Sequence, residues 1–239
     1  MSDESSTDKA GIRPHGWGVI VGTLWVFVAF IGPQFLVSGL VPFIKNLNVG
    51  SDTKLFVLEA LTELIILAVI LLVIKFYSSS LKDIGLLAKL TVRDLGLVLI
   101  CFPLYLLTSG ILSEVIGRLF PGLNLLDQQQ IGFHASQVPE MVLVFIALVI
   151  IPPFVEETVF RGFLFKAYRR RFGFVWASLL VSFWFAIAHA PIGVSIDVFA
   201  LSLYLCYVRD KTGSLWASIL LHSLKNLVAF VFLFIIPTR

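Results

Sequence analysis

The sequence predicts an all-α, polytopic membrane protein in which seven to eight transmembrane helices form one bundle with a polar cavity. Of its 239 residues, 58% are hydrophobic and only 14% are charged, whereas soluble domains have roughly half and a quarter. The mean hydropathy is +0.97. The charged residues gather in a few short stretches between long apolar runs. Because so few charges cannot cover the surface of a soluble fold of this size, the bilayer is the expected solvent for most of the chain.

The composition excludes two other classes. A net charge of +3 is too small and too clustered for a polyanion-binding surface, so no nucleic acid partner is expected. The two cysteines, Cys101 and Cys206, lie in apolar runs, where a thiol behaves as a small hydrophobic side chain. Neither a disulfide framework nor a cysteine metal cluster is expected.

Long apolar runs predict the individual spans. The first, 17–44, contains Gly32 and Pro33, which indicate one kinked span or a span with a re-entrant piece. The fourth begins near 139 and continues past Pro152 and Pro153, which predicts one kinked helix of roughly 30 residues that crosses the membrane and protrudes. The remaining expected spans are 55–76, 95–116 with a bend at Pro103, 174–189, 194–208 and 215–236.

The chain has no repeat, no low-complexity tract and no linker rich in Gly, Pro or Ser, so a single domain is expected. Within it we distinguish a polar N-terminal tail, 1–16, without the features of a removable signal peptide. N-terminal transmembrane helices follow at 17–138, and core helices with most of the unusual polar residues occupy 139–239.

Basic residues predict the orientation in the membrane. They concentrate at 75–94, 166–171 and 209–211, in stretches that alternate with loops poor in Lys and Arg. The basic stretches should face the cytoplasm. With seven crossings the N terminus is then cytoplasmic and the C terminus outside, whereas an eighth, broken span would reverse one end.

Six polar residues lie well inside apolar segments, where an ionisable group costs at least a few kcal/mol. They are Glu156, Glu157, Arg161, His189, His222 and Asn226. Glu157 and His189 each lie 16 residues from Gly173, which puts both about 24 Å from that turn in an antiparallel hairpin. The same construction from the turn at Lys211 puts His222 and Asn226 at roughly 16 and 22 Å. Three helices therefore direct polar groups toward one layer, more than polar contacts between helices require.

Local spacing supports this cluster. Glu157 and Arg161 are at i, i+4, so the arginine can neutralise that carboxylate and leave Glu156 free to face a neighbouring helix. His222 and Asn226 have the same spacing. The other acids, Glu59, Glu63, Glu114 and Asp197, are expected near the interfaces, whereas Lys225 can snorkel, pair with an acid or line a wet cavity.

A carboxylate, two imidazoles and an amide form a set that can activate water and stabilise an oxyanion. Two histidines and a glutamate can also hold zinc, but the chain has no His-Glu-x-x-His segment. The Gly-x-Ser-x-Gly and Gly-x-Gly-Asp motifs are absent as well. A hydrolase without a cofactor is therefore expected, with no metal ligand among these residues and zinc as the less favoured alternative.

At these residues the sequence resembles the CPBP intramembrane proteases, which include type II CAAX prenyl proteases and abortive-infection and bacteriocin-immunity homologues. The motif Glu-Glu-x-x-x-Arg is matched by Glu156, Glu157 and Arg161. Phe-x-x-x-His is matched by Phe185 and His189, and the third motif, His-x-x-x-Asn, ends the series at His222 and Asn226. The resemblance covers roughly 140–230.

The resemblance implies a glutamate-dependent endopeptidase whose site opens to the cytoplasm, acting on a membrane-associated or lipidated, CAAX-like peptide in a bacterial cell membrane. It assigns Glu156 and His189 to activation of water and His222 and Asn226 to the oxyanion. Glu157, Arg161 and Phe185 then support the catalytic residues. Lys225 departs from the family pattern, and either binds a substrate carboxylate or snorkels. The expected partners are membrane lipids and a membrane-associated peptide or protein.

Two other functions are consistent with the residues. A non-catalytic immunity or scaffold protein could use the same fold to bind a bacteriocin or a processing enzyme. A small transporter or proton-coupled channel could use the buried glutamates. The transporter is less favoured because the acids cluster with an oxyanion-type pair and do not follow a path across the membrane.

Overall fold

The computed structural model describes residues 17–77, 79–125, 131–189 and 191–236, which form helices and contain no strand. Six helices in this part of the chain are long and apolar enough to cross a membrane. They are α1 (Val19–Ser38), α3 (Ser51–Phe76), α4 (Val92–Leu119), the composite helix Val138–Arg171, α9 (Ile192–Thr212) and the composite helix Leu215–Ile235. The chain is therefore an all-α polytopic membrane protein, while the predicted tail at 1–16 lies outside the described residues.

The span predicted at 174–189 is shorter than a full crossing. The helix found there, α8 (Phe174–Ile187), is apolar but has 14 residues, which gives it a length of about 21 Å against a hydrocarbon core of about 30 Å. A count of seven spans therefore includes α8, and the described ranges hold no further apolar helix of similar length. The span predicted at 194–208 is longer than expected, because α9 extends to Thr212.

The first apolar run divides later than its Gly and Pro residues suggest. Pro33 lies inside α1, which continues to Ser38, and the chain then turns at Gly39 into the short helix α2 (Val41–Lys45). A proline removes one backbone hydrogen bond, and the rest of a long apolar helix tolerates this loss. Pro103 is likewise accommodated inside α4.

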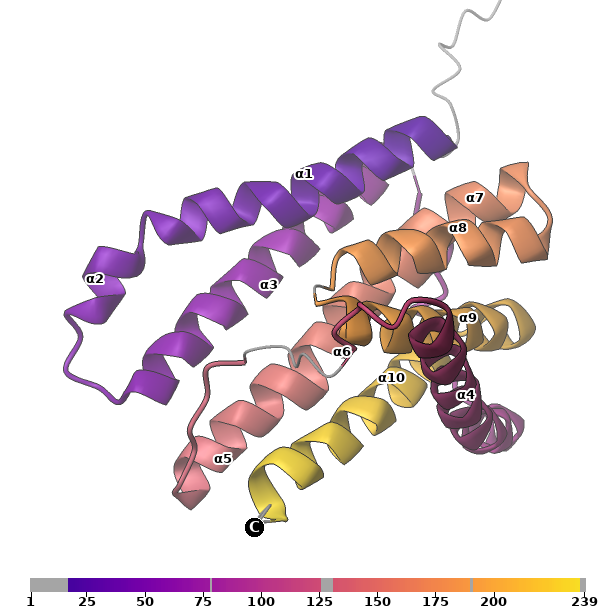
Figure 1. The fold of residues 1–239 in the computed structure, drawn as a ribbon. Helices are drawn as coiled ribbons and strands as arrows, with labels where there is room; N and C mark the ends of the chain where they lie inside the picture. Colours follow the sequence, from indigo (N-terminus) through magenta and orange to yellow (C-terminus); the bar gives the residue numbers. More distant parts are fainter. Residues whose placement is uncertain (1–16, 78, 126–130, 190, 237–239) are drawn as a thin grey trace, which may run out of the picture.

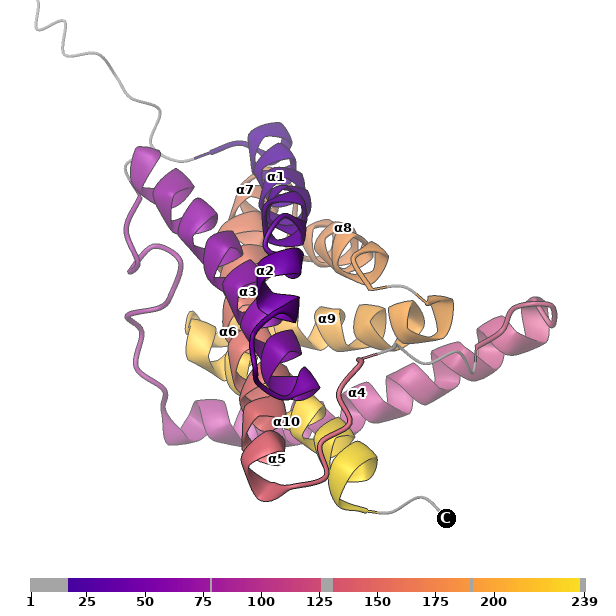
Figure 2. The ribbon, with the colours of Figure 1, turned by 90° about the vertical axis from the view of Figure 1, so that its left-hand side faces the viewer.

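The helix predicted from about 139 to 171 runs through the middle of the bundle (Figures 1 and 2). It has 34 residues and is about 51 Å long, so it crosses the membrane and protrudes. Two π-helical segments divide it. In order it consists of α5 (Val138–Phe145), η1 (Ile146–Ile150), α6 (Ile151–Glu157), η2 (Thr158–Leu164) and α7 (Phe165–Arg171).

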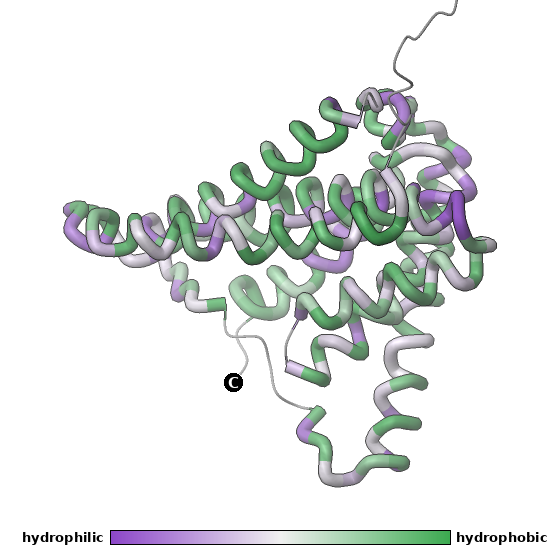
Figure 3. The backbone as a smooth tube through the Cα atoms, turned by 90° about the horizontal axis from the view of Figure 1, so that it is seen from above, coloured by the Kyte–Doolittle hydropathy of each residue, from purple (hydrophilic) through white to green (hydrophobic). Residues whose placement is uncertain are grey.

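The main hydrophobic core surrounds η2, which contacts α1, α3, α8, α9 and α10 (Leu215–Phe230). Phe160 and Phe163 are buried there, and Trp17 stacks on Phe163 while its indole nitrogen donates to the Phe163 carbonyl at 3.0 Å. Outside the core the helices are mostly hydrophobic, and the hydrophilic positions gather at turns and helix ends (Figure 3). An apolar outer surface over a packed interior is expected when lipid is the solvent.

Candidate active site

The two consecutive glutamates at the end of α6 occupy different environments. The side chain of Glu157 is completely buried, whereas that of Glu156 keeps 13% of its surface exposed. Consecutive positions on a helix differ by about 100°, so the two carboxylates face different neighbours. Of the two, Glu156 is therefore the one whose side chain keeps contact with solvent, although its Oε2 atom is buried and has no hydrogen-bond partner among the described residues.

Glu157 joins a buried chain of charged groups. Arg161 Nη1 donates to Glu157 Oε1 at 2.9 Å, as the i, i+4 spacing predicts, and both side chains are fully buried. His222 Nδ1 lies 3.0 Å from the same oxygen. Because a carboxylate paired with arginine accepts hydrogen bonds, Nδ1 is assigned as the protonated nitrogen of His222. Ser202 Oγ accepts from Arg161 Nη2 at 2.6 Å and fixes the guanidinium from α9.

Glu156 lies between two imidazoles. Its Oε2 atom is 3.7 Å from His189 Nε2 and 3.9 Å from His222 Nε2. His189 Nδ1 lies 2.8 Å from the carbonyl oxygen of Phe185, which can only accept. Nδ1 of His189 therefore carries the proton, and in the neutral ring the lone pair of Nε2 faces Glu156. The end of α6, the turn after α8 and the middle of α10 thus bring three titratable groups together.

Asn226 is fixed by a hydrogen bond whose origin can be read from the sequence. Its Nδ2 donates to the carbonyl of Leu148 at 2.8 Å. In an α-helix that carbonyl would accept from residue 152, and in a π-helix from residue 153, but both are prolines and have no N–H. Asn226 supplies the missing donor and ties α10 to η1.

Phe185 packs against the charged cluster from α8. Its ring centroid lies 4.6 Å from that of His189 and 5.8 Å from that of His222. The guanidinium carbon of Arg161 lies 4.4 Å from the same ring centre, within the range of cation–π attraction. One fully buried aromatic ring therefore limits the positions of both imidazoles and of the arginine.

The glutamate that lies beside His189 is not the one that counting residues from Gly173 indicates. Equal distances from Gly173 put Glu157 opposite His189, whereas the carboxylate beside His189 is that of Glu156. Glu157 turns instead toward Arg161 and His222. Counting along a hairpin gives the height of a residue but not its rotation about the helix axis, so it cannot decide between neighbouring residues.

Glu63 was expected near the interface, but it belongs to the surroundings of this cluster. It lies on α3, close enough to Glu156 and Glu59 for their like charges to repel one another. Its Oε2 atom is buried and has no hydrogen-bond partner among the described residues. The i, i+4 spacing of Glu59 and Glu63 was the available signal, because it shows that both acids share one helix face.

Lys225 and Asp197 form a polar group beside the cluster. Lys225 Nζ lies 3.9 Å from Asp197 Oδ2, and Asp197 also accepts from Ser109 Oγ at 2.7 Å and Tyr105 OH at 3.1 Å. Asp197 lies near the start of α9, its side chain is 30% exposed, and its contacts join α4, α9 and α10. Its interfacial depth stays a prediction. Of the alternatives for Lys225, pairing with an acid is the one observed.

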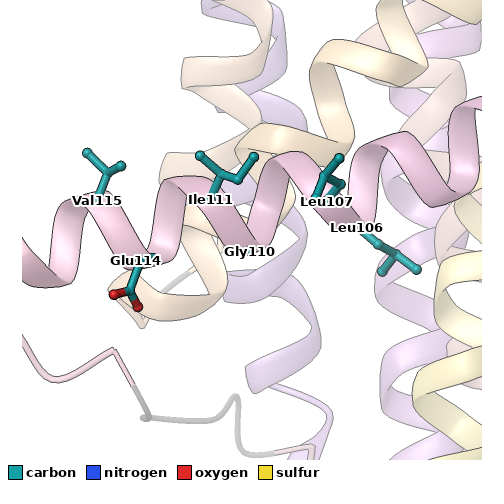
Figure 4. A pocket seen from close by; sticks show the side chains of 6 residues that line it. All are labelled: Leu106, Leu107, Gly110, Ile111, Glu114 and Val115. Carbon is teal, nitrogen blue, oxygen red and sulfur yellow. The ribbon is translucent and has the colours of Figure 1, made fainter.

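Neither a cluster of metal-ligating side chains nor the surface hollow on α4 adds to the site. No group of three or more His, Cys, Asp or Glu side chains in the described ranges has an arrangement that could hold a metal ion. A hollow of about 380 Å³ lies along one face of α4 (Figure 4), and none of the glutamate, arginine, histidine and asparagine residues of the candidate site lines it. Its lining residues are Leu106, Leu107, Gly110, Ile111, Glu114 and Val115.

Comparison with known proteins finds a partial match to one family model, over the region that holds this cluster. Residues 138–228 match the model of the family described as type II CAAX prenyl endopeptidase Rce1-like. The chain is 37% identical over 92 residues to UPF0177 protein YaiF of Lactococcus lactis subsp. lactis (strain IL1403), a match that covers 37% of this chain and 39% of that protein. It is 27% identical over 105 residues to an uncharacterized 24.3 kDa protein of Escherichia coli, covering 42% and 48%.

These matches are partial, since the chain spans less than half the length of both curated relatives. No solved structure matches the chain. The matched region contains the two glutamates, Arg161, both histidines and Asn226.

Proposed function

We propose a function from one premise: through residues 138–228 the chain belongs to the type II CAAX prenyl endopeptidase Rce1-like family. We infer that it is an intramembrane endopeptidase that hydrolyses a peptide bond of a membrane-associated or lipidated, CAAX-like peptide. Water activated by Glu156 and His189 is the nucleophile. One observation carries the proposal: Oε2 of the partly exposed Glu156 lies 3.7 Å from Nε2 of His189.

That geometry suits a water molecule with both of its hydrogens engaged. An ionised Glu156 and the Nε2 lone pair of His189 are both acceptors, so a water lying beside the pair donates one hydrogen to each. Its own lone pairs then point away from the two acceptors, toward an incoming carbonyl carbon. As the C–O bond forms, the proton passes to the Glu156–His189 pair, which later delivers it to the leaving amine.

The groups on α10 are proposed to stabilise the oxyanion. In its imidazolium form His222 donates from Nδ1 to Glu157, which offsets its charge, and leaves the Nε2 proton for the substrate oxygen. Asn226 uses one amide hydrogen on Leu148 and has a second one available. Glu157 and Arg161 act through His222, so they are positioning residues.

The membrane location of the site is part of the proposal. The basic stretches at 75–94, 166–171 and 209–211 favour a cytoplasmic position for the turns that carry them, and the bilayer is taken to be a bacterial cell membrane. In this orientation the proposed site at Glu156 is reached from the cytoplasmic side. No metal or other cofactor is required for the steps described.

The test is peptide cleavage by the full chain reconstituted in liposomes, with a panel of lipidated and unlipidated peptides analysed by mass spectrometry. Glu156→Gln and His189→Ala should each reduce cleavage by at least about 100-fold. Glu114→Gln is the matched control, because it removes a carboxylate that is exposed on α4 and paired with Arg118. Undiminished cleavage by folded Glu156→Gln protein would contradict the proposal.

The alternative is a non-catalytic immunity or scaffold protein, which the complete set of motif residues disfavours. It predicts that Glu156→Gln and His189→Ala leave protection against a bacteriocin unchanged in cells that express the variants at wild-type levels. Loss of protection in both variants, with protection retained in Glu114→Gln, favours the endopeptidase.

A further inference from the structure

A second polar site lies between α7 and the end of α9, apart from the glutamate–histidine cluster. It is a pocket of about 250 Å³ in which cationic side chains predominate. Five arginine and lysine residues line it against a single carboxylate. The lining residues are Arg161, Phe165, Lys166, Arg169, Arg170, Arg209, Asp210 and Gly213.

Three of these cations have buried nitrogen atoms without a hydrogen-bond acceptor among the described residues. The atoms are Nζ of Lys166, Nε of Arg209 and Nε of Arg161. Cations that only set membrane topology are expected to point into water. A buried donor that lacks a partner costs about 1–3 kcal/mol, and more when it is charged. These three nitrogen atoms therefore lack an acceptor that carries negative charge.

The nearby carboxylates do not fill this role. Asp210 accepts from Arg169 Nε at 2.8 Å, so its charge is largely matched by that arginine. Asp83 Oδ1 is 3.9 Å from Lys166 Nζ, too far for a hydrogen bond. The backbone and hydroxyl of Ser80 donate to Asp83 and hold the pKa of its carboxyl below its usual range.

The shape of the pocket is held by the connection between α3 and α4, which runs down one side of the bundle in Figure 2. Gly85 lies so close to Arg209 that a Cβ atom there would be 2.6 Å from Nη2. The positive charges of Arg170 and Arg209 lie close enough to oppose that of Lys166. Like charges are thus confined together, an arrangement that a bound anion would stabilise.

We propose that this pocket binds a phosphate-bearing anion. Guanidinium and ammonium groups that converge on one cavity match the oxygens of a phosphate. The pocket lies at the ends of the spans Val138–Arg171 and Ile192–Thr212, where phospholipid headgroups are expected. The phosphate can belong to an anionic phospholipid or be free in solution. The site does not depend on the proposed hydrolysis, and Arg161 alone joins it to the Glu157–His222 pair.

The experiment measures the thermal stability of the detergent-purified full chain with short-chain phosphatidic acid, inorganic phosphate or short-chain phosphatidylcholine. A ligand that binds the folded state raises Tm, and a saturable rise of at least about 3 °C is expected with phosphatidic acid but not with phosphatidylcholine. An equal rise with inorganic phosphate identifies free phosphate as sufficient. A rise with the lipid alone identifies a headgroup site.

Lys166→Gln and Arg209→Gln should each remove most of this rise. Arg171→Gln is the matched control, because it removes the same charge from an exposed position outside the pocket lining. Equal losses in all three variants, or an equal rise with phosphatidylcholine, would overturn the proposal. Calorimetric titration of wild-type protein with phosphatidic acid should give close to one equivalent bound. Absence of binding there overturns the proposal even if the variants fail to fold.

Discussion

The amide of Asn226 replaces the backbone donor that two prolines remove from Leu148. Asn226 Nδ2 and the Leu148 carbonyl oxygen are 2.8 Å apart, and residues 152 and 153 have no N–H to offer that carbonyl. The side chain therefore has a structural task in addition to the oxyanion role proposed for its second amide hydrogen. The two tasks can be separated, because only the first depends on the prolines.

Asn226→Leu should lower the free energy of unfolding by about 1 kcal/mol, since it leaves the Leu148 carbonyl unsatisfied in an apolar region. In a Pro152→Ala background the new N–H can bond to Leu148, so the same substitution should cost less. The measurement is a double-mutant cycle from unfolding in mixed micelles. If Asn226→Leu lowered the free energy of unfolding equally in both backgrounds, the assigned hydrogen bond to Leu148 would be contradicted. Peptide cleavage should stay impaired in both backgrounds, because the proposed oxyanion role does not depend on the prolines.

Arg161 neutralises a carboxylate that has no access to water. Arg161→Met should therefore destabilise the protein by about 3–5 kcal/mol, because Glu157 would remain buried and charged without its main partner. Adding Glu157→Gln should recover much of this loss, since the remaining amide is neutral. Thermal unfolding of the single and double variants provides the measurement, with Arg118→Met on the exposed surface as control. A double variant less stable than Arg161→Met would refute the pairing.

The sequence was sufficient to predict the class of fold and the layer of polar residues. Both depend on quantities that a linear chain contains: long apolar runs, and residue counts from a turn that translate into height along a helix. The i, i+4 pair of Glu157 and Arg161 was also predictable, because it lies within one helix.

Contacts that depend on the rotation of one helix against another could not be predicted by residue counting, and only the family resemblance paired Glu156 with His189. Residue counting put Glu157 and not Glu156 opposite His189, and it treated Glu63 on α3 as interfacial. The partnership of Lys225 with Asp197 requires the relative rotation of α9 and α10, which packing of the whole bundle decides.

Lys225 offers a test of substrate selection. We expect its ammonium group, already drawn to Asp197 at 3.9 Å, to attract the C-terminal carboxylate of a peptide. Lys225→Met should then raise KM about tenfold for a peptide with a free C terminus and leave an amidated peptide unaffected. Steady-state kinetics on the two peptides decide the matter. An equal change for both, or none, would leave Lys225 as a structural partner of Asp197.

Gly85 is required where the α3–α4 connection approaches the turn between α9 and α10. Its φ is +81°, and an added Cβ would lie 2.6 Å from both Arg209 Nη2 and the Gly213 carbonyl oxygen. The Gly85 carbonyl accepts from the Leu215 N–H at 3.0 Å, so the backbone has little freedom to move away. Gly85→Ala should lower the free energy of unfolding by about 1–3 kcal/mol.

The control is Gly96→Ala inside α4, where a Cβ meets nothing within 4 Å and alanine should stabilise the helix by about 0.5–1 kcal/mol. Thermal unfolding of the two variants should therefore give Tm shifts of opposite sign. An equal fall in Tm for both variants would show that the close approach at Gly85 is not the cause of its destabilisation.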